Sequence, residues 1–121
     1  MLPAPNRLRD RGDFTSAVRG SGSVRAGSRL VVVHANQTDA RAGHPPRVGF
    51  VVSKAVGGAV VRNRTKRRLR SVLAGALDTL PDGVDVVVRA NAGAALASQG
   101  ELSTTVNPLV HKVIARLGGV R

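Results

Sequence analysis

The sequence predicts a single α+β domain, a small two-layer sandwich in which a mixed sheet packs against helices. Short runs rich in valine have the composition of buried strands, and longer runs repeat their apolar residues at helical spacing. In chain order these runs predict helix, strand, strand, helix, strand and helix, at residues 7–19, 30–35, 47–53, 59–77, 84–89 and 101–117. A chain of 121 residues is long enough for one hydrophobic core and too short for two, so residues 1–121 are expected to form one domain.

The N-terminal part of the chain predicts one short helix between two irregular segments. Residues 1–6 contain two prolines, and we expect them to be extended or flexible. The first helix has Asp13 as its candidate N-cap, and it places Phe14 and Val18 on one side because they are four residues apart. Residues 20–28 are rich in glycine and serine, so they predict a connector.

The remaining segments are separated by clear turn signals. Residues 36–46 contain a Pro-Pro pair and predict a loop between the first two strands. Residues 81–83, Pro-Asp-Gly, predict a turn before the third strand. Residues 90–98 are rich in alanine and predict a short helical turn. Ser98 is the candidate cap of the last helix, and Pro108 is expected to kink that helix.

Residues 59–77 are predicted to form an amphipathic helix with a strongly basic side. Six of the nine residues from Arg62 to Arg70 are basic, and none is acidic. Helical spacing gives an apolar stripe of Val61, Thr65, Leu69, Val72, Leu73 and Ala76. The opposite side carries Asn63, Lys66, Arg67 and Arg70, with Arg64 and Arg68 beside them. Like charges three and four residues apart repel, so external anions are expected, and nucleic acid is the first candidate.

The composition supports a polyanionic partner. The formal net charge is +12, which suits nucleic acid better than a small acidic substrate. The chain has no cysteine, so it has no disulfide framework or thiolate metal site, and a cytoplasmic location is expected. The first residues lack the apolar core of a signal peptide, and no apolar run reaches membrane-spanning length, so we expect no membrane partner.

The sequence contains no recognisable catalytic or metal-binding motif. His34, His44 and His111 lack metal-ligand spacing, and we expect each to be structural or solvated. Asp82 and Asp85 lie close together beside a predicted turn, which favours a role in the turn and at the start of the strand over an acid–base pair. An enzyme that acts without a partner is therefore disfavoured.

Residues 47–70, RVGFVVSKAVGGAVVRNRTKRRLR, resemble the signature of the bacterial ribonuclease P protein component. The Arg-Asn-Arg-x-Lys-Arg core of the basic helix stands at the family's spacing from the preceding Ser-Lys and glycine. The matching residues include Arg47, Val48, Gly49, Ser53, Lys54, Gly57, Ala59, Val60, Arg62, Asn63, Arg64, Lys66, Arg67 and Arg70. Weaker agreement extends over residues 6–117, through Asp13-Phe14 and the strand that begins at Asp85.

This resemblance implies the small basic subunit of a ribonucleoprotein that removes the 5′ leader from precursor tRNA. The implied partners are ribonuclease P RNA and precursor tRNA, with no DNA. The RNA would hold the catalytic centre and the Mg²⁺ ions, so no catalytic or metal-binding residue is expected in this chain. The family also implies a left-handed βαβ crossover around the basic helix, against the usual preference.

The resemblance also implies two groups of binding residues. Contact with the catalytic RNA is implied for Arg62, Asn63, Arg64, Lys66, Arg67, Arg68 and Arg70. A cleft between the sheet and the first helix would guide the single-stranded leader, with Phe14, Val18, Lys54 and Arg89 as its candidate residues. The chain departs from the family in having only two aromatic residues, Phe14 and Phe50. Phe50 suits a core role and a binding role equally.

Two other classes of protein stay open from the residues themselves. A structural RNA-binding protein of the ribosomal type would share the charge and the fold class. A catalytic nuclease is disfavoured, because the sequence shows no carboxylate cluster for metal ions.

Overall fold

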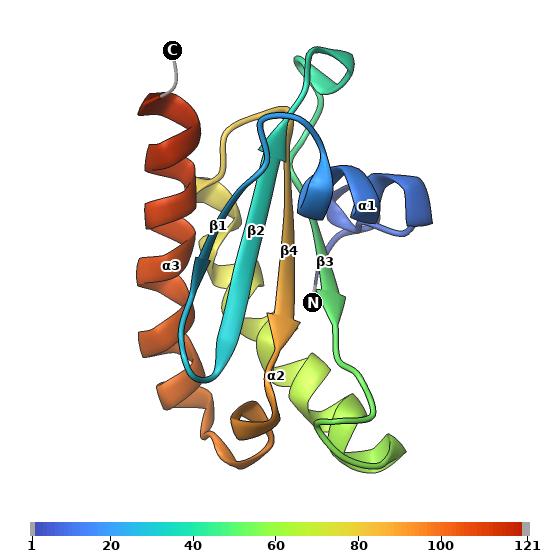
Figure 1. Ribbon diagram of the computed structural model, residues 1–121, viewed down its shortest axis with the longest axis vertical. Helices are drawn as coiled ribbons and strands as arrows, with labels where there is room; N and C mark the ends of the chain where they lie inside the picture. Colours follow the sequence, from blue (N-terminus) through green and yellow to red (C-terminus); the bar gives the residue numbers. More distant parts are fainter. Residues whose placement is uncertain (1, 120–121) are drawn as a thin grey trace.

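The computed structural model describes residues 2–119, and the side chains of residues 2–118. This part of the chain forms a four-stranded sheet and three α-helices, with short 3₁₀ turns between them (Figure 1). The strands are β1 (Val24–Gly27), β2 (Val31–Gln37), β3 (Arg47–Val51) and β4 (Val84–Ala90). The helices are α1 (Arg11–Arg19), α2 (Ala59–Ala76) and α3 (Gln99–Gly119). The predicted α+β class is confirmed.

The sheet is mixed, as predicted, and its strand order is β1-β2-β4-β3. Strand β4 pairs antiparallel with β2, where Val88 lies opposite Val33, and parallel with β3, where Val86 lies beside Val48. Strand β1 pairs antiparallel with β2 and forms one edge. The connection β3–α2–β4 is therefore a crossover between adjacent parallel strands, and its left-handedness stays a prediction.

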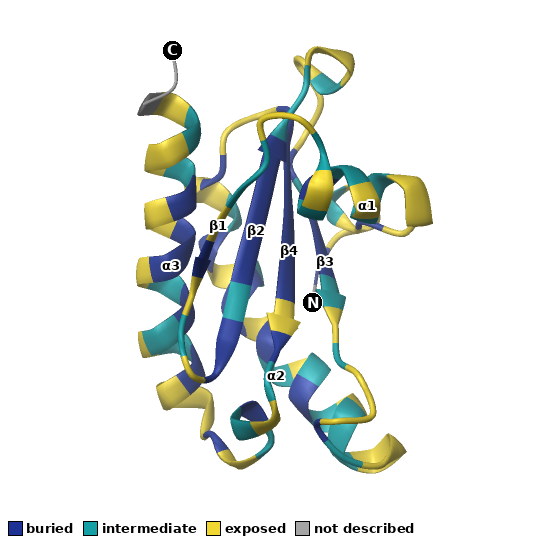
Figure 2. Ribbon diagram, in the orientation of Figure 1, coloured by how far each residue is buried: buried dark blue, intermediate teal, exposed yellow. Residues whose placement is uncertain are grey.

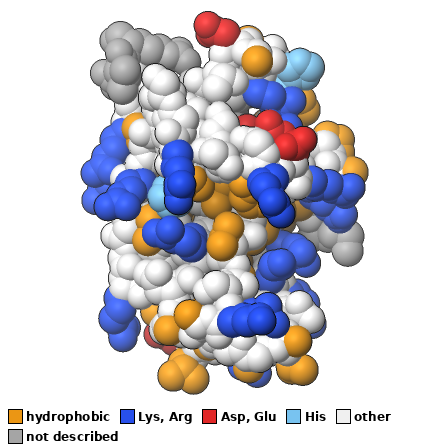
Figure 3. Space-filling view, turned by 45° about the vertical axis from the view of Figure 1, so that its right-hand side comes forward, with side chains coloured by type: hydrophobic (Ala, Val, Ile, Leu, Met, Phe, Trp, Pro, Cys, Tyr) orange, Lys and Arg blue, Asp and Glu red, His pale blue; other side chains and the backbone are white. Residues whose placement is uncertain are grey.

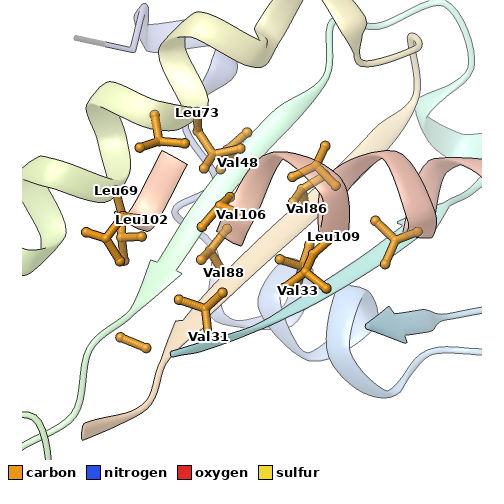
Figure 4. Packing of buried hydrophobic residues seen from close by; sticks show 14 of the residues in the cluster. Val31, Val33, Val48, Leu69, Leu73, Val86, Val88, Leu102, Val106 and Leu109 are labelled. Atoms are coloured by element: carbon orange, nitrogen blue, oxygen red, sulfur yellow. The ribbon is translucent and has the colours of Figure 1, made fainter. Parts of the chain in front are cut away.

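The main hydrophobic core lies between one face of the sheet and the helices α2 and α3 (Figures 2 and 4). Side chains alternate along a strand, so Val33 and Val86 both point to this face. Leu73 of α2 and Val106 of α3 belong to the same cluster, where Leu73 lies beside Val48 and Val106 beside Val88 (Figure 4). Each fully buried valine or leucine contributes about 1.5–3 kcal/mol relative to exposure, so this layer supplies most of the stabilisation.

The other face of the sheet is partly covered by α1 (Figure 1), which forms a second and smaller core. Ala17 of α1 and Leu8 before it are buried against Val87 of β4. Phe14 and Val18 of α1 are partly buried and pack beside them. Strand β4 is therefore covered on both faces along most of its length (Figure 2).

A strand replaces part of the predicted connector. The connector was expected at residues 20–28, but Val24–Gly27 forms β1 against β2. The segment has four residues, and its apolar side chains are those of Val24 and Ala26. Strand propensity is strongly dependent on context, so pairing with β2 determines this edge strand more than its own composition does.

The N-terminal segment is packed, where the sequence suggested an extended or flexible chain. Leu2 is 1% exposed and belongs to the main core. Ala4–Asn6 forms a 3₁₀ turn, and the amide Nδ2 of Asn6 donates a hydrogen bond to the carbonyl of Pro46 at 2.8 Å. Burial of Leu2 and this long-range hydrogen bond both anchor the segment.

The start of α1 also differs from the prediction. The helix begins at Arg11, and its N-cap is Asp10, whose carboxylate accepts a hydrogen bond from the backbone N–H of Gly12 at 2.7 Å. The prediction of Asp13 as the cap was wrong, because Asp13 lies within the first helical turn. Its carboxylate is consequently free to interact with the sheet.

The cap of the last helix agrees with the prediction. The hydroxyl of Ser98 accepts a hydrogen bond from the N–H of Glu101, and the Glu101 carboxylate accepts one from the N–H of Ser98, both at 3.1 Å. This reciprocal pair is a capping box. The helix begins at Gln99, two residues before the predicted start, and it continues through Pro108. The predicted short helical turn before it is the 3₁₀ segment Ala92–Leu96.

The contact between α1 and the sheet predicts a strong size limit at Gly49 of β3. A Cβ atom at Gly49 would lie 2.4 Å from Cζ of Phe14 and 3.1 Å from Cβ of Leu8. We expect Gly49→Ala to displace α1 and to lower the free energy of unfolding by about 1–3 kcal/mol, measured by urea denaturation.

Gly75→Ala is the matched control. Within the described residues, a Cβ atom at this exposed position of α2 meets nothing within 4 Å. Alanine there should raise the free energy of unfolding by about 0.4–1 kcal/mol, because it restricts the unfolded chain. A Gly49→Ala protein as stable as the parent would contradict the observed packing of Phe14 on the sheet.

Candidate nucleic-acid interface

Helix α2 is fixed to the domain by its apolar stripe. Thr65, Leu69, Val72, Leu73 and Ala76 are buried, as the spacing predicted, and Val61 is partly buried. The hydroxyl of Thr65 donates a hydrogen bond to the carbonyl of Val61 at 2.9 Å, so this buried polar group is satisfied. The stripe sets the rotation of the helix about its axis, and this rotation directs the basic side chains away from the core.

The basic side of α2 lines a surface hollow of about 570 Å³. Its lining residues are Arg7, Asn63, Lys66, Arg67, Arg70 and Ser71. Arg7 comes from the segment before α1, and sequence reasoning did not place it there. Within the described residues every ion pair involves Arg47, so the cations of this hollow have no carboxylate partner. A concave surface with this charge suits a phosphate backbone.

Arg62, Arg64 and Arg68 flank the hollow and differ in their surroundings. Nη1 of Arg68 donates a hydrogen bond to the carbonyl of Ala97 at 2.9 Å, and Nε2 of Gln99 donates one to the carbonyl of Arg68 at 3.2 Å. Arg68 therefore ties α2 to the start of α3. Arg62 and Arg64 are half-buried, and within the described residues their Nε atoms have no hydrogen-bond partner.

A second hollow, of about 430 Å³, extends the charged surface towards α1. It shares Arg7, Lys66 and Arg70 with the first hollow, and its lining also includes Phe14 and Phe50. We name the surface formed by the two hollows the basic path. Lys and Arg side chains are spread over this side of the molecule, whereas Asp and Glu gather mostly near its upper end (Figure 3). Phe50 is partly buried and packs against the main core, so the structure favours a core role for it.

Arg47 of β3 joins α1 to the sheet. Its Nε and Nη2 atoms donate hydrogen bonds to the two carboxylate oxygens of Asp85 at 2.9 and 2.8 Å, and Nη1 donates to Asp13 at 3.0 Å. The hydrogen bonds to Asp85 are the main cause that raises the pKa of Arg47. We name this group the Arg47 latch. Sequence reasoning assigned Asp85 a role at the turn and the start of the strand and missed the latch, because Asp13 and Asp85 are 34 and 38 residues from Arg47 in the sequence.

The four predicted leader-binding residues lie at different places. Phe14 and Val18 are neighbours in the smaller core. Arg89 is exposed on β4, two residues beyond Val87 and on the same face of the sheet. Lys54 is exposed in the turn after β3. In the structure Phe14 and Val18 therefore lie together, and Lys54 and Arg89 lie apart from them. The binding role of all four residues stays a prediction.

The fold and the unpaired basic side of α2 define the class: a small basic α+β domain with a surface suited to a polyanion. Sequence comparison gives the family. A family model described as Ribonuclease P matches residues 2–114, which is nearly the whole chain. The chain belongs to the ribonuclease P protein component family, and its family name associates it with tRNA processing.

Relatives match over most of their length. The chain is 48% identical to the ribonuclease P protein component of Streptomyces bikiniensis over an alignment 127 positions long, which covers 100% of each chain. It is 55% identical to that of Beutenbergia cavernae over 107 residues, which cover 88% of this chain and 87% of the relative.

Solved structures confirm the fold at lower identity. The RNase P protein of Staphylococcus aureus superposes with a TM-score of 0.74 at 22% identity, covering 89% of this chain and 96% of that one. The Thermotoga maritima protein superposes with a TM-score of 0.73 at 22% identity, covering 88% and 96% of the two chains. The arrangement of the sheet and helices is therefore that of bacterial RNase P proteins.

Three further features bear on the expected site. Within residues 2–119 no helix is long and apolar enough to cross a membrane. His34 is buried, whereas His44 and His111 are exposed. No group of three or more His, Cys, Asp or Glu side chains within the described residues could hold a metal ion.

The Arg47 latch predicts unequal costs for removing its two carboxylates. Asp85→Ala leaves a guanidinium group that is 17% exposed without its bidentate partner, and we expect the free energy of unfolding to fall by about 3–5 kcal/mol. The side chain of Asp13 is 37% exposed, so Asp13→Ala should cost only about 0.2–1 kcal/mol. Urea denaturation of both variants measures the difference. Equal losses of unfolding free energy would show that the ion pair with Asp85 stabilises the fold no more than the pair with Asp13 does.

Proposed function

We propose that this chain is the RNA-binding protein subunit of ribonuclease P. It would bind the RNA of that enzyme through the basic side of α2 and guide the single-stranded 5′ leader of precursor tRNA along the α1 face of the sheet. Family membership supports the role in tRNA processing. The observation that supports the proposed contact with RNA is the basic path, whose cations lack carboxylate partners within the described residues.

Electrostatics explains how the basic side would work. Each phosphate that Arg67 or Arg70 neutralises releases condensed counterions, which favours binding at low salt. A guanidinium group presents a planar fork of donors that matches phosphate oxygens, and Asn63 can add a directed hydrogen bond. Because the buried stripe holds α2 rigidly on the core, these groups are positioned before the RNA arrives. Less ordering is then required on binding.

We place the catalytic centre in the RNA partner. Hydrolysis of a phosphodiester by bound Mg²⁺ requires oxygen ligands that converge on the ions. Asp13 and Asp85 converge in the described part of this chain, but the guanidinium group of Arg47 occupies both carboxylates. These donors do not fit a magnesium site, so in our proposal the RNA holds the Mg²⁺ ions.

A structural protein of the ribosomal type is the competing assignment, since the same basic helix would suit it. Cross-linking the protein to RNA in cells, followed by sequencing of the bound RNA, separates the two. Recovery of ribonuclease P RNA supports our proposal, and recovery of ribosomal RNA alone supports the competitor. A cytoplasmic location and the absence of DNA partners stay predictions.

The first functional prediction concerns cleavage itself. The protein without RNA should leave precursor tRNA intact at any magnesium concentration. Added to its cognate RNA at low magnesium, it should stimulate cleavage, because a basic subunit relieves repulsion between two polyanions. Gel analysis of the 5′ products measures both. Magnesium-dependent cleavage by RNA-free protein would refute the proposal that the catalytic centre lies in the RNA.

The second functional prediction concerns Arg67, which is exposed and lines the basic path. Arg67→Ala should weaken binding of the cognate RNA by about 1–3 kcal/mol without lowering the melting temperature, because truncation leaves no cavity. Binding should also fall with salt by about 0.7–0.9 log units per phosphate contact.

Lys112→Ala is the control for Arg67→Ala. Lys112 is an exposed cation on α3 outside the basic path, so its removal lowers the net charge by one and leaves the basic path unchanged. Equal losses of RNA affinity in the two variants would exclude α2 as the specific contact surface.

A further inference from the structure

The segment before α1 passes around the outer edge of β3 and is fixed at both of its ends. Leu2 is 1% exposed and belongs to the main core, between the sheet and the helices α2 and α3. Leu8 is 5% exposed and belongs to the smaller core, on the opposite face of the sheet. Residues 2–8 therefore run from one core to the other, and Arg7 lies at the edge that they cross.

Hydrogen bonds hold the backbone around Arg7 against β3. Arg7 pairs with Val48 in a parallel bridge, and the N–H of Leu8 donates a hydrogen bond to the carbonyl of Val48 at 3.0 Å. One residue earlier, Nδ2 of Asn6 donates to the carbonyl of Pro46 at 2.8 Å. The backbone of Arg7 is consequently held in one place, and its side chain starts from a fixed point.

The side chain of Arg7 is oriented by one of its own donors. Nε donates a hydrogen bond to the carbonyl of Leu2 at 2.9 Å. Within the described residues the two Nη groups of Arg7 form no hydrogen bond and no ion pair. Because a guanidinium group is planar, a bound Nε also restricts the direction of the Nη donors. A phosphate that reaches these donors finds them already in position.

Arg7 adds a second element to the first hollow of the basic path. It lines that hollow together with Lys66, Arg67 and Arg70, whereas all the other described lining residues belong to α2. Phosphate groups project their oxygens in several directions, so a bound strand can be contacted from α2 and from the segment before α1 at the same time. The hollow therefore has cations on two walls.

A role in folding alone explains only part of this arrangement. The hydrogen bond to the Leu2 carbonyl uses Nε, and a neutral donor could serve that carbonyl without bringing a charge. The Nη groups of Arg7 are exposed beside the like charges of α2, with no carboxylate partner within the described residues. Such a charge is unfavourable in the free protein and becomes favourable when an anion enters the hollow.

We propose that Arg7 contacts a phosphate group of the RNA partner and that Leu2 positions Arg7 for this contact. The identity of the partner rests on the proposed function. Residues 2–8 are then a second wall of the RNA interface, built on the edge of the sheet and separate from the basic side of α2. Leu2 acts through Arg7, because the burial of Leu2 fixes the carbonyl that holds Nε.

The first test measures binding of ribonuclease P RNA by the full chain over a range of salt concentrations. Arg7→Gln should weaken binding about five- to tenfold, as expected for one lost phosphate contact. It should also reduce the slope of log affinity against log salt by about 0.7–0.9, because one phosphate fewer is neutralised. Arg7→Lys keeps the charge and should keep the slope of the parent, which a purely structural role of Arg7 would not predict.

Arg11→Gln is the matched control for Arg7→Gln. Arg11 is an exposed arginine at the start of α1, outside the basic path, so the variant loses the same charge from a neighbouring part of the chain. It should bind RNA with the affinity and slope of the parent, and thermal unfolding compares the stabilities of the variants. The contact is overturned if Arg7→Gln binds like the parent, or if Arg11→Gln loses as much affinity.

The second test asks whether Leu2 acts through Arg7. Leu2→Ala should weaken RNA binding about two- to fivefold, because Arg7 is then no longer held in position before the RNA arrives. In the Arg7→Gln protein the same change should have no further effect on RNA affinity, since the residue that Leu2 positions is gone. Equal effects of Leu2→Ala in the two proteins would overturn the positioning role.

Leu109→Ala separates positioning from a general loss of stability. Leu109 belongs to the same core as Leu2 but lies on α3, outside the basic path. Both variants should lower the melting temperature, and RNA binding is measured at a temperature at which both remain folded. Leu109→Ala should bind RNA like the parent. A loss of affinity as large as that of Leu2→Ala would overturn the positioning role, because stability alone would then explain both.

The same measurements distinguish failure of this inference from failure of the proposed function. If Arg67→Ala weakens binding of ribonuclease P RNA and Arg7→Gln does not, the contact by Arg7 is refuted and the proposed function stands. If the parent protein prefers ribosomal RNA, the proposed function is refuted. The salt slopes of the parent and of Arg7→Gln on that RNA then decide whether Arg7 contacts a phosphate.

Discussion

Strand β4 pairs with β2 on one side and with β3 on the other, and the rest of the structure depends on these two ladders. Val86 and Val88 face α2 and α3, while Val87 faces α1, so this one strand joins both hydrophobic cores. A strand buried on both faces requires a nearly continuous apolar run. Asp85 interrupts that run at low cost, because Arg47 satisfies its carboxylate. The same carboxylate, through Arg47, also holds α1 against the sheet.

The local elements were predictable because their physical cause is local. The 3.6-residue period of α2 is present in the sequence, and the buried residues from Thr65 to Ala76 follow it. The valine runs of β2 and β4 and the capping box at Ser98 are likewise properties of neighbouring residues. The predicted contact residues on α2 lie on the surface that their spacing indicated. Arg68 differs from the others because it also donates a hydrogen bond to the carbonyl of Ala97.

The features that were missed depend on partners distant in the sequence. Strand β1 exists because β2 offers it a ladder, and its composition gives little sign of this. The Arg47 latch joins residues more than thirty positions apart, and no periodicity reports such a contact. Arg7 joins the basic hollow because the N-terminal segment is anchored through Leu2. That the buried ring of His34 has no hydrogen-bond partner within the described residues could be seen only from the arrangement of the strands around it.

Helix α2 carries its basic side chains on one side and its core residues on the other, so the stability of the fold depends on whether an anion is bound to the basic side. Lys66 and Arg70 are like charges four residues apart on α2, so they repel one another when the helix is formed. The helix is formed in the folded state, so this repulsion lowers the free energy of unfolding of the free protein. A polyanion that binds the native surface removes the repulsion and adds its own binding free energy to folding. Molecules without such a ligand spend more time unfolded and are more open to proteolysis. The amount of protein that persists in a cell would then follow the amount of its partner, without a dedicated regulator.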